Sequence, residues 1–261
     1  MISEMQRHLQ TETLGRSAAY YTNIDSTSTY LKTRWHLLDD GFTVIAAEQS
    51  AGRGRTGKTF FSPKNDGLYL SFVLKDEQYR KDPLFTVKMS YAVCMAIDRL
   101  TATTNVSIKW VNDIYIDHRK LAGILCESVK KGAQSAILVG VGVNFAVDKA
   151  LVPSELRHKI GSLHNVTKKK LDKATLCAYI LNEVERLFFG TPETPPMSAE
   201  EFLAAYRRRS AVLGREILVM KQEKGLRAAA LDIAPDGGLI VRYETGASEK
   251  LTAGEISILL S

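Results

Sequence analysis

The sequence is poor in cysteine, and its cysteines and histidines lack the spacing of a metal site. The three cysteines lie far apart without a C-x-x-C pair, so neither a disulfide framework nor a zinc site is expected. The five histidines are scattered, and no H-E-x-x-H motif occurs. We therefore expect no zinc site and no paired metal ligands of the protein's own, and a reducing, cytoplasmic environment.

Long apolar runs and a leader-like start are also missing. No run approaches the ~20 residues of a membrane-spanning helix, and residues 1–13 are polar, unlike a signal peptide. The sequence therefore predicts a protein that neither spans a membrane nor is exported. No G-x-S-x-G elbow occurs, so the hydrolases that use this nucleophile turn are not indicated.

Positive charge is in excess. The formal net charge is +6 and the isoelectric point is about 9.1, which suits phosphate-bearing ligands or acidic partners without selecting nucleic acid among them. Basic runs occur at residues 168–170 and 207–209, but no aromatic side chains interleave with them. These runs therefore indicate solvated helix faces rather than a nucleic-acid stripe.

The most informative stretch is residues 52–63, called here the glycine loop, which holds three glycines and three cations. As a bare pattern it matches both the P-loop of NTPases and the dinucleotide fingerprint. Both need a helix at the last glycine, whereas Pro63 and a turn follow, and residues 68–74 read as a buried strand. We favour a strand-to-strand loop that closes over a phosphorylated or adenylated ligand, with a P-loop NTPase as the weaker alternative.

Three hydroxyl side chains stand where a helix is expected to begin. Ser26, Thr27 and Ser28 precede apolar residues at helical spacing, so they can cap the helix or line a pocket, and the sequence leaves both interpretations open. A short buried strand at 43–47 then leads to Gln49 and the glycine loop.

Two later strands carry glycines that would leave part of a sheet face bare. Lys120 begins one strand, and Gly123 lies inside it. A lysine at a strand start is usually edge protection, but a glycine inside a strand favours close approach of a ligand. In the strand at 136–145, Gly140 and Gly142 share one face because side chains alternate. A planar apolar ligand or a packed helix could occupy that face.

The character of the chain changes near residue 211. Short strands joined by turns follow, as in a small β-barrel. We expect a catalytic domain at residues 1–211 and a small barrel domain at 212–261.

Taken together, four stretches resemble the biotin–protein ligase family. They are the glycine loop, K-W-V-N-D at 109–113, K-L-A-G-I-L at 120–125 and G-V-G-V-N at 140–144, and the resemblance runs in order from about residue 25 to the C-terminus. It implies an α+β fold. A catalytic domain like that of class II aminoacyl-tRNA synthetases, with a mixed sheet and helices, would be followed by an SH3-like barrel.

The resemblance also implies an activity. A biotin–protein ligase uses ATP and Mg²⁺ to activate biotin as biotinyl-5'-AMP, and transfers it to a lysine of a biotin carboxyl carrier protein domain, as in acetyl-CoA carboxylase. Lipoate–protein ligase shares the fold and the adenylation chemistry and is the nearest alternative. Some family members carry an N-terminal helix-turn-helix, but only about two dozen residues precede Asp25 here. We therefore expect a monofunctional enzyme without specific DNA binding, and a homodimer is left open.

The implied site divides by ligand. The residues expected to bind biotin are Ser26, Thr27, Ser28, Gln49, Gly52, Arg53, Gly54, Arg55, Lys120, Gly123 and Gly142. Those expected to bind ATP are Arg55, Lys58, Phe60, Asn112, Asp113, Lys120 and Asn144.

Three of these residues are expected to be catalytic. Arg53 and Lys120 would offset the repulsion between the carboxylate and the α-phosphate. Asp113 would orient the acceptor lysine, whose ordinary pKa is near ~10.4.

Four positions depart from the family pattern. Ser28, Lys58, Phe60 and Val111 stand where asparagine, arginine, tryptophan and proline are usual. Lys58 keeps the charge of arginine but loses its planar fork, and Phe60 keeps a ring but loses the indole N–H.

Overall fold

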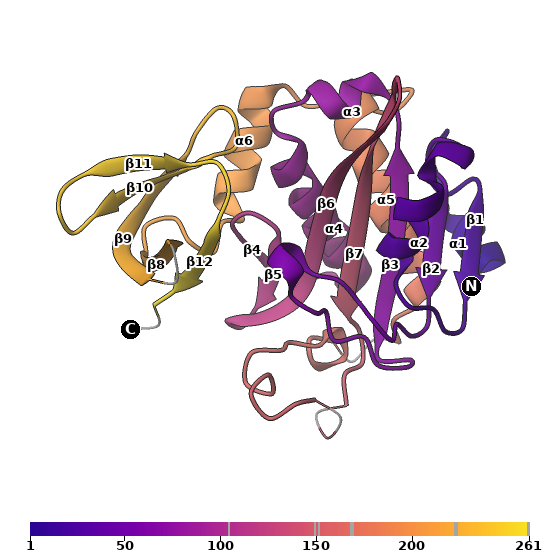
Figure 1. Cartoon of the computed structure of the whole chain (residues 1–261), viewed down its shortest axis with the longest axis horizontal. Coiled ribbons are helices and arrows are strands. Elements are labelled where there is room, and N and C mark those ends of the chain that lie inside the picture. The colour runs from indigo at the N-terminus through magenta and orange to yellow at the C-terminus, as the bar shows by residue number, and fades with distance from the viewer. Residues whose placement is uncertain (104, 149, 151, 168–169, 222–223, 260–261) are drawn as a thin grey trace.

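The fold is built on a seven-stranded mixed sheet (Figure 1). The computed structural model describes residues 1–261 except 104, 149, 151, 168–169, 222–223 and 260–261, so Lys168 and Lys169 of the first basic run lie outside the described residues. In spatial order the strands are β1 (Ala18–Tyr21), β2 (Thr43–Ala46), β3 (Gly67–Leu74), β7 (Gln134–Asn144), β6 (Arg119–Lys131), β5 (Asp113–Ile116) and β4 (Ser107–Lys109). Strands β1 and β2 are parallel and the other neighbours antiparallel.

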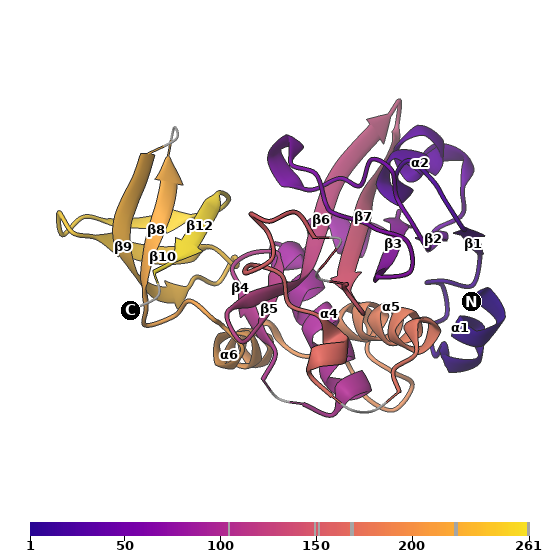
Figure 2. The ribbon, with the colours of Figure 1, turned by 90° about the horizontal axis from the view of Figure 1, so that it is seen from below.

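Helices cover both faces of this sheet, and they divide the core in two. The long helices α4 (Phe85–Thr101) and α5 (Lys173–Phe189) lie with α1 (Ile2–His8) on one face, and α2 (Thr27–Arg34) lies with the glycine loop on the other (Figures 1 and 2). Residues of β3 enter both cores by alternation: Phe72 packs toward α4 and α5, and Val73 packs toward α2. Because it is covered on both faces, β3 is buried along its whole length.

Local sequence signals explain where most helices begin. The Asp172 side chain accepts a hydrogen bond from Thr175 N at 2.6 Å and caps α5. Helix α6 (Ala199–Arg208) starts with a capping box formed by Ser198 and Glu201. Ahead of α4, Asp82 Oδ1 accepts from Leu84 N at 2.7 Å, and regular helix begins only at Phe85. A short helix, α3 (Glu77–Lys81), precedes it.

The N-terminal segment is attached to α5. Met5 of α1 is fully buried, and the Glu185 carboxylate accepts the backbone N–H groups of Thr13 at 3.1 Å and Leu14 at 3.0 Å. Residues before Ser26 therefore contribute one helix, and that helix is packed into the main core.

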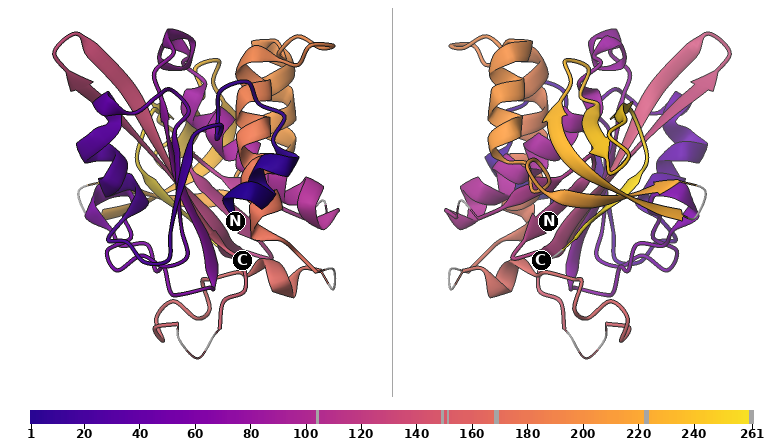
Figure 3. Two further views of the ribbon diagram at one scale, coloured as in Figure 1. Left: turned by 90° about the vertical axis from the view of Figure 1, so that its right-hand side faces the viewer. Right: turned by 90° about the vertical axis from the view of Figure 1, so that its left-hand side faces the viewer.

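Strands β6 and β7 form a long hairpin that extends past the neighbouring strands (Figure 3). Asp117 and His118 form the tight turn between β5 and β6, and both have positive φ, at 46° and 61°.

The C-terminal part is a five-stranded antiparallel sheet, seen at the opposite end of Figure 1 from the N-terminus. Its strands, in spatial order, are β11 (Ser248–Leu251), β10 (Leu239–Tyr243), β9 (Lys224–Ile233), β8 (Glu216–Lys221) and β12 (Glu255–Ile258). The α+β fold expected from the sequence is confirmed. The boundary at 211 and 212 lies between α6 and β8 and stays a prediction.

Specific contacts attach this small barrel to the catalytic part. Trp110 Nε1 donates to Gly237 O at 2.9 Å, and Arg207 Nε donates to Asp232 Oδ1 at 2.6 Å. Within the catalytic part, Arg209, which follows α6, pairs with Asp98 of α4. The interpretation of residues 207–209 as a solvated helix face is therefore wrong for two of its three arginines, because these form ion pairs that join elements.

Among the helices that the structure describes, none combines the length and the apolar character that crossing a membrane requires.

Candidate active site

A cavity of about 790 Å³ lies between the glycine loop, the α2 face of the large sheet and the small barrel. Of the residues expected to bind ligands, it is lined by Thr27, Ser28, Gln49, Arg53, Gly54, Arg55, Lys58, Phe60, Asn112, Asp113, Lys120, Gly123 and Gly142. Ser26, Gly52 and Asn144 are outside the lining. Among the described lining residues five are cationic and one, Asp113, is a carboxylate, so the cavity favours anions.

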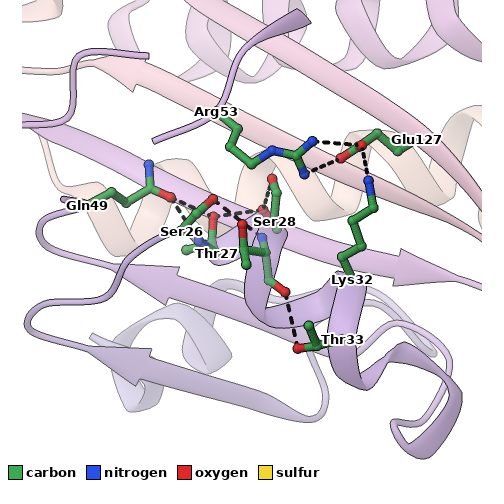
Figure 4. Close-up of polar contacts among 10 residues, drawn as sticks. Ser26, Thr27, Ser28, Lys32, Thr33, Gln49, Arg53 and Glu127 are labelled. Carbon is green, nitrogen blue, oxygen red and sulfur yellow. Dashed lines mark hydrogen bonds and ion pairs between the residues drawn. The ribbon is translucent and has the colours of Figure 1, made fainter. Parts of the chain in front are cut away.

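The two interpretations of the hydroxyl cluster apply to different residues (Figure 4). Ser26 is 1% exposed and accepts a hydrogen bond from Thr29 N at 3.4 Å, so it caps α2. Thr27 and Ser28 instead line the cavity, and their hydroxyls lie 2.8 and 3.2 Å from Ser71 Oγ. Ser71 lies on β3 and was not singled out from the sequence.

Gln49 is held in one orientation by three hydrogen bonds. Its Oε1 accepts from Thr27 N at 2.9 Å and Thr27 Oγ1 at 3.1 Å, while its Nε2 donates to Ser62 Oγ at 3.0 Å. The glycine loop can run close to Ser62 and Phe60 because Gly52 has no side chain. A Cβ at Gly52 would lie 2.5 Å from both Phe60 O and Ser62 Oγ. Gly52 is therefore needed for the path of the loop rather than as part of the cavity wall.

Arg53 forms a bidentate ion pair that the sequence did not predict. Its Nη1 and Nη2 donate to the two carboxylate oxygens of Glu127 at 3.0 and 3.1 Å, and Lys32 Nζ donates to the same carboxylate at 2.9 Å (Figure 4). Burial raises the pKa of Glu127, but the hydrogen bonds from Lys32 and Arg53 outweigh it and hold that pKa below its ordinary value. Glu127 follows Gly123 by four residues on one strand face, a spacing that could have drawn attention to it.

Arg55 connects the glycine loop to two other parts of the site. Its Nη1 donates to Asn112 Oδ1 at 2.7 Å, and its Nη2 donates to Gly254 O of the barrel at 3.2 Å. Asn112 is fixed in turn, since its Nδ2 donates to Ile124 O at 3.0 Å.

The glycine loop does not have the structure of a P-loop. Residues 55–57 form a single 3-10 turn, the chain then runs extended to Pro63, and the next helix begins only at Glu77. All residues between these points are described, and no helix begins at or directly after the last glycine of the loop. The P-loop NTPase alternative is therefore wrong.

Lys120 and Asp113 form the charged pair at the mouth of β6. Lys120 Nζ lies 2.7 Å from Asp113 Oδ1. Strand β6 lies between β5 and β7, so Lys120 does not protect a sheet edge. Asn144 is 6% exposed, and its Nδ2 donates to Lys120 O at 3.0 Å. Asn144 thus holds the Lys120 backbone and is outside the cavity lining.

The bare sheet face is covered by the ring of Phe60. Gly123 and Gly142 are direct partners in the β6–β7 ladder, and a Cβ at Gly142 would lie 2.5 Å from Phe60 Cε1. A Cβ at Gly123 would lie 3.3 Å from the same ring, and one at Gly140 would lie 2.6 Å from Ser28 Oγ. A ring of the glycine loop therefore uses the space at Gly123 and Gly142, whereas Ser28 of the packed helix α2 uses the space at Gly140.

Several lining residues were not expected from the sequence. The barrel supplies Met220, Ala253, Gly254 and Ile256, and the K-W-V-N-D stretch also supplies Lys109 and Trp110. Val111, in the place usually held by proline, is buried, and the Trp110–Val111 peptide bond is cis.

Comparison with known proteins agrees with this arrangement. Residues 20–144 match the model of the biotin/lipoate A/B protein ligase family, and residues 212–259 match the biotin protein ligase C terminal domain. The bifunctional ligase/repressor BirA of Escherichia coli K12 is 30% identical over 251 residues, which are 94% of this chain and 74% of that protein. The biotin–[acetyl-CoA-carboxylase] ligase of Mycobacterium tuberculosis H37Rv is 28% identical, over 83% of this chain and 79% of that protein.

Solved structures show the same architecture. The biotin protein ligase of Aquifex aeolicus, in complex with biotin and ATP, aligns with a TM-score of 0.76 at 24% identity, covering 94% of this chain and all of the other. Fold and family models together define a two-part protein ligase, a catalytic domain followed by a ligase-type barrel. The chain belongs to the biotin/lipoate A/B protein ligase family.

Proposed function

We propose that this protein is an ATP-dependent ligase that activates biotin as biotinyl-5'-AMP and transfers it to a lysine of a biotin carboxyl carrier protein domain. The observation that carries the proposal is the chemistry of the cavity from one end to the other. Neutral hydrogen-bonding groups of Thr27, Ser28 and Gln49 line the cavity on the side of Gly140, and Lys120 lies beside Gly123, which is two residues further along the β6–β7 ladder. Biotin has a neutral ureido group, an apolar ring and chain, and a carboxylate in that order.

The hydroxyl end favours biotin over lipoate. A site built to hydrogen-bond a ligand rejects an analogue that lacks the matching polar group by large factors. The dithiolane of lipoate offers no strong donor or acceptor to Thr27, Ser28 or Gln49, whereas the ureido group of biotin offers both. Lipoate ligation remains the alternative that the experiment must separate.

In the first step a biotin carboxylate oxygen attacks the α-phosphorus of ATP, and pyrophosphate leaves. Both reactants are anions, so fixed cations must offset their repulsion inside the cavity. Lys120 and Arg55, which line the cavity, would provide this charge, and Lys58 and Lys109 add positive charge to the lining. The bidentate fork of Arg55 suits a carboxylate or phosphate oxygen, although it must leave Asn112 or Gly254 to bind one.

The donor set fits Mg²⁺ that arrives with ATP. Mg²⁺ keeps several waters and takes one or two carboxylates together with phosphate oxygens, and Asp113 is the carboxylate among the described lining residues. Asp113, with the Asn112 carbonyl beside it, would hold the ion, which supplies charge neutralisation to the phosphates when bound.

In the second step the amine of the acceptor lysine attacks the acyl carbonyl of biotinyl-AMP. An amide bond forms, AMP leaves, and the amine must give up a proton. Asp113 is the proposed group that orients this amine, and its pairing with Lys120 at 2.7 Å keeps it at the mouth of the site. The acceptor belongs to a biotin-dependent carboxylase, as the name of the M. tuberculosis ligase indicates for that protein.

The experiment that tests the proposal is pyrophosphate release from ATP and Mg²⁺ with biotin, with lipoate, or with neither. We expect release that depends on biotin. Release with lipoate but not biotin would establish the lipoate ligase, and equal release without either acid would contradict both ligase functions.

A further inference from the structure

We propose that Glu127 is a positioning residue, which holds the glycine loop closed over the hydroxyl end of the cavity by binding the Arg53 side chain. The inference rests on the proposed function, because it assigns the loop's role in holding biotin. It also changes the role expected of Arg53, which was to offset the repulsion between the carboxylate and the α-phosphate.

The ion pair has the geometry of an anchor rather than of a loose surface contact. Both terminal nitrogens of Arg53 reach Glu127, at 3.0 and 3.1 Å, in the planar fork that arginine forms with a carboxylate. The Glu127 side chain is 20% exposed and also accepts from Lys32 at 2.9 Å. Isolated exposed pairs contribute little, but a half-buried network with bidentate geometry is the exception.

The three charged groups come from three separate elements. Lys32 lies in the last turn of α2, Glu127 lies on β6, and Arg53 lies in the glycine loop (Figure 4). The helix that supplies Lys32 also supplies Thr27 and Ser28 at its first turn. The network therefore joins the loop to the strand and helix that form the hydroxyl end.

The strand register places Glu127 away from the reacting end of the cavity. Glu127 pairs with Leu138 across the ladder, and Gly123 pairs with Gly142 four residues earlier. At about 3.3 Å per residue this separates them by roughly 13 Å, and Lys120 lies three residues further still. Arg53 bound to Glu127 is thus at the opposite end from the Lys120 and Asp113 pair. Its charge acts on loop position rather than on the α-phosphate.

Anchoring Arg53 also positions Phe60. The glycine loop folds back on itself, since Gly54 N donates to Lys58 O at 2.7 Å and Phe60 N donates to Gly52 O at 2.9 Å. Arg53 and Thr59 face each other across this narrow hairpin. Phe60 follows Thr59 directly and lies on the glycine floor, so fixing Arg53 fixes the ring that covers Gly142.

A consequence follows for kinetics. The loop contains three glycines, and ordering it costs conformational entropy that the ligand would otherwise have to offset. A loop already held by Glu127 lowers that cost and slows escape of the bound ligand. Loss of the anchor should raise the KM for biotin and speed biotin dissociation, with little effect on kcat once biotin is saturating.

The test uses Glu127→Gln in the full chain. Glu77→Gln is the matched control, because Glu77 forms an exposed ion pair with Lys81 on α3, outside the cavity lining. In Glu127→Gln we expect the KM for biotin to rise roughly fivefold or more, with kcat within twofold of wild type. Trypsin should also cut faster after Arg53 or Arg55 in the ligand-free protein. In the control Glu77→Gln, the KM for biotin and the rate of trypsin cleavage should both equal those of wild type.

Glu127→Asp separates charge from general stability. It keeps the carboxylate with a shorter side chain, and we expect it to restore part of the loss in KM. If kcat and the melting temperature both fall in the two Glu127 variants, Glu127 has a merely structural role and the inference is overturned. An unchanged KM for biotin in Glu127→Gln would overturn it as well. Absence of biotin turnover in the wild-type protein is a separate result, and it would contradict the proposed function instead.

Discussion

The ring of Phe60 occupies the space that a side chain at Gly142 would need. A Cβ at position 142 would lie 2.5 and 2.6 Å from two ring carbons of Phe60, well inside van der Waals contact. Phe60 comes from the glycine loop and Gly142 from β7, so this contact links loop position to the floor of the cavity.

The first prediction uses this contact. Gly142→Ala should displace Phe60 and with it the loop, raising the KM for biotin or ATP by at least tenfold while leaving the melting temperature nearly unchanged, because the ring lies over a cavity and can move. Steady-state kinetics with each substrate varied, together with thermal unfolding, measure both effects. In the double variant Gly142→Ala with Phe60→Ala the clash is removed, so part of the rise in KM should be reversed. A KM as high as in Gly142→Ala alone would show that the alanine at position 142 does not act through Phe60.

The second prediction concerns Lys120. Lys120→Ala should leave the fold intact and reduce biotinyl-AMP formation by ~10²–10³-fold, the usual cost of removing one group that stabilises a transition state. Single-turnover formation of the adenylate measures it. A rate within tenfold of wild type would show that Lys120 serves only to balance the charge of Asp113.

The third prediction is a pH dependence of stability. The folded-state pKa of Glu127 lies below its ordinary value of 4.5, because hydrogen bonds from Lys32 and Arg53 outweigh the opposing effect of burial. A carboxyl group whose pKa is lower in the folded than in the unfolded chain stabilises the fold at pH values above its unfolded-state pKa. This stabilisation is lost as the pH falls through the folded-state pKa. The difference in melting temperature between wild type and Glu127→Gln should therefore be constant above about pH 5 and shrink below pH 4.5. A difference that grows on acidification would contradict the pairing.

The fourth prediction concerns DNA. The described residues before Ser26 supply one short helix, α1, and it packs against α5, so they do not form the two packed helices of a helix-turn-helix. We predict that these 261 residues by themselves bind DNA only weakly and in a salt-sensitive way, with dissociation constants of roughly 10⁻⁴–10⁻⁶ M. A mobility shift at physiological salt, with and without biotin and ATP, checks this. Biotin-dependent binding to one defined sequence would prove the prediction wrong.

The sequence predicted those parts of the site that local motifs encode. The glycine loop, Asn112, Asp113 and Lys120 could be named because each belongs to a short stretch with a characteristic order of residue types. Alternation of side chains along one strand put Gly140 and Gly142 on one face, whereas the floor shared by Gly123 and Gly142 was implied by the family resemblance.

The parts that sequence reasoning missed depend on long-range pairing. Glu127 binds Arg53 from 74 positions away, and Arg55 reaches Gly254 across 199. The spacing of Glu127 from Gly123 could mark its strand face, but neither that spacing nor a glycine in a barrel turn indicates which distant arginine it meets. Ser26 shows the reverse case: it belongs to the recognised motif, but its hydroxyl caps the helix while its neighbours face the cavity.

The central claim is that one cavity both adenylates biotin and passes it to an acceptor lysine. It is tested most directly by incubating the protein with biotin, ATP and Mg²⁺, separating protein-bound small molecules by mass spectrometry, and then adding a biotin carboxyl carrier domain. We predict that biotinyl-5'-AMP accumulates on the protein and disappears as biotin appears on the carrier, in equal amounts. Absence of the adenylate, or a lipoyl adenylate formed in preference when both acids are supplied, would contradict the account.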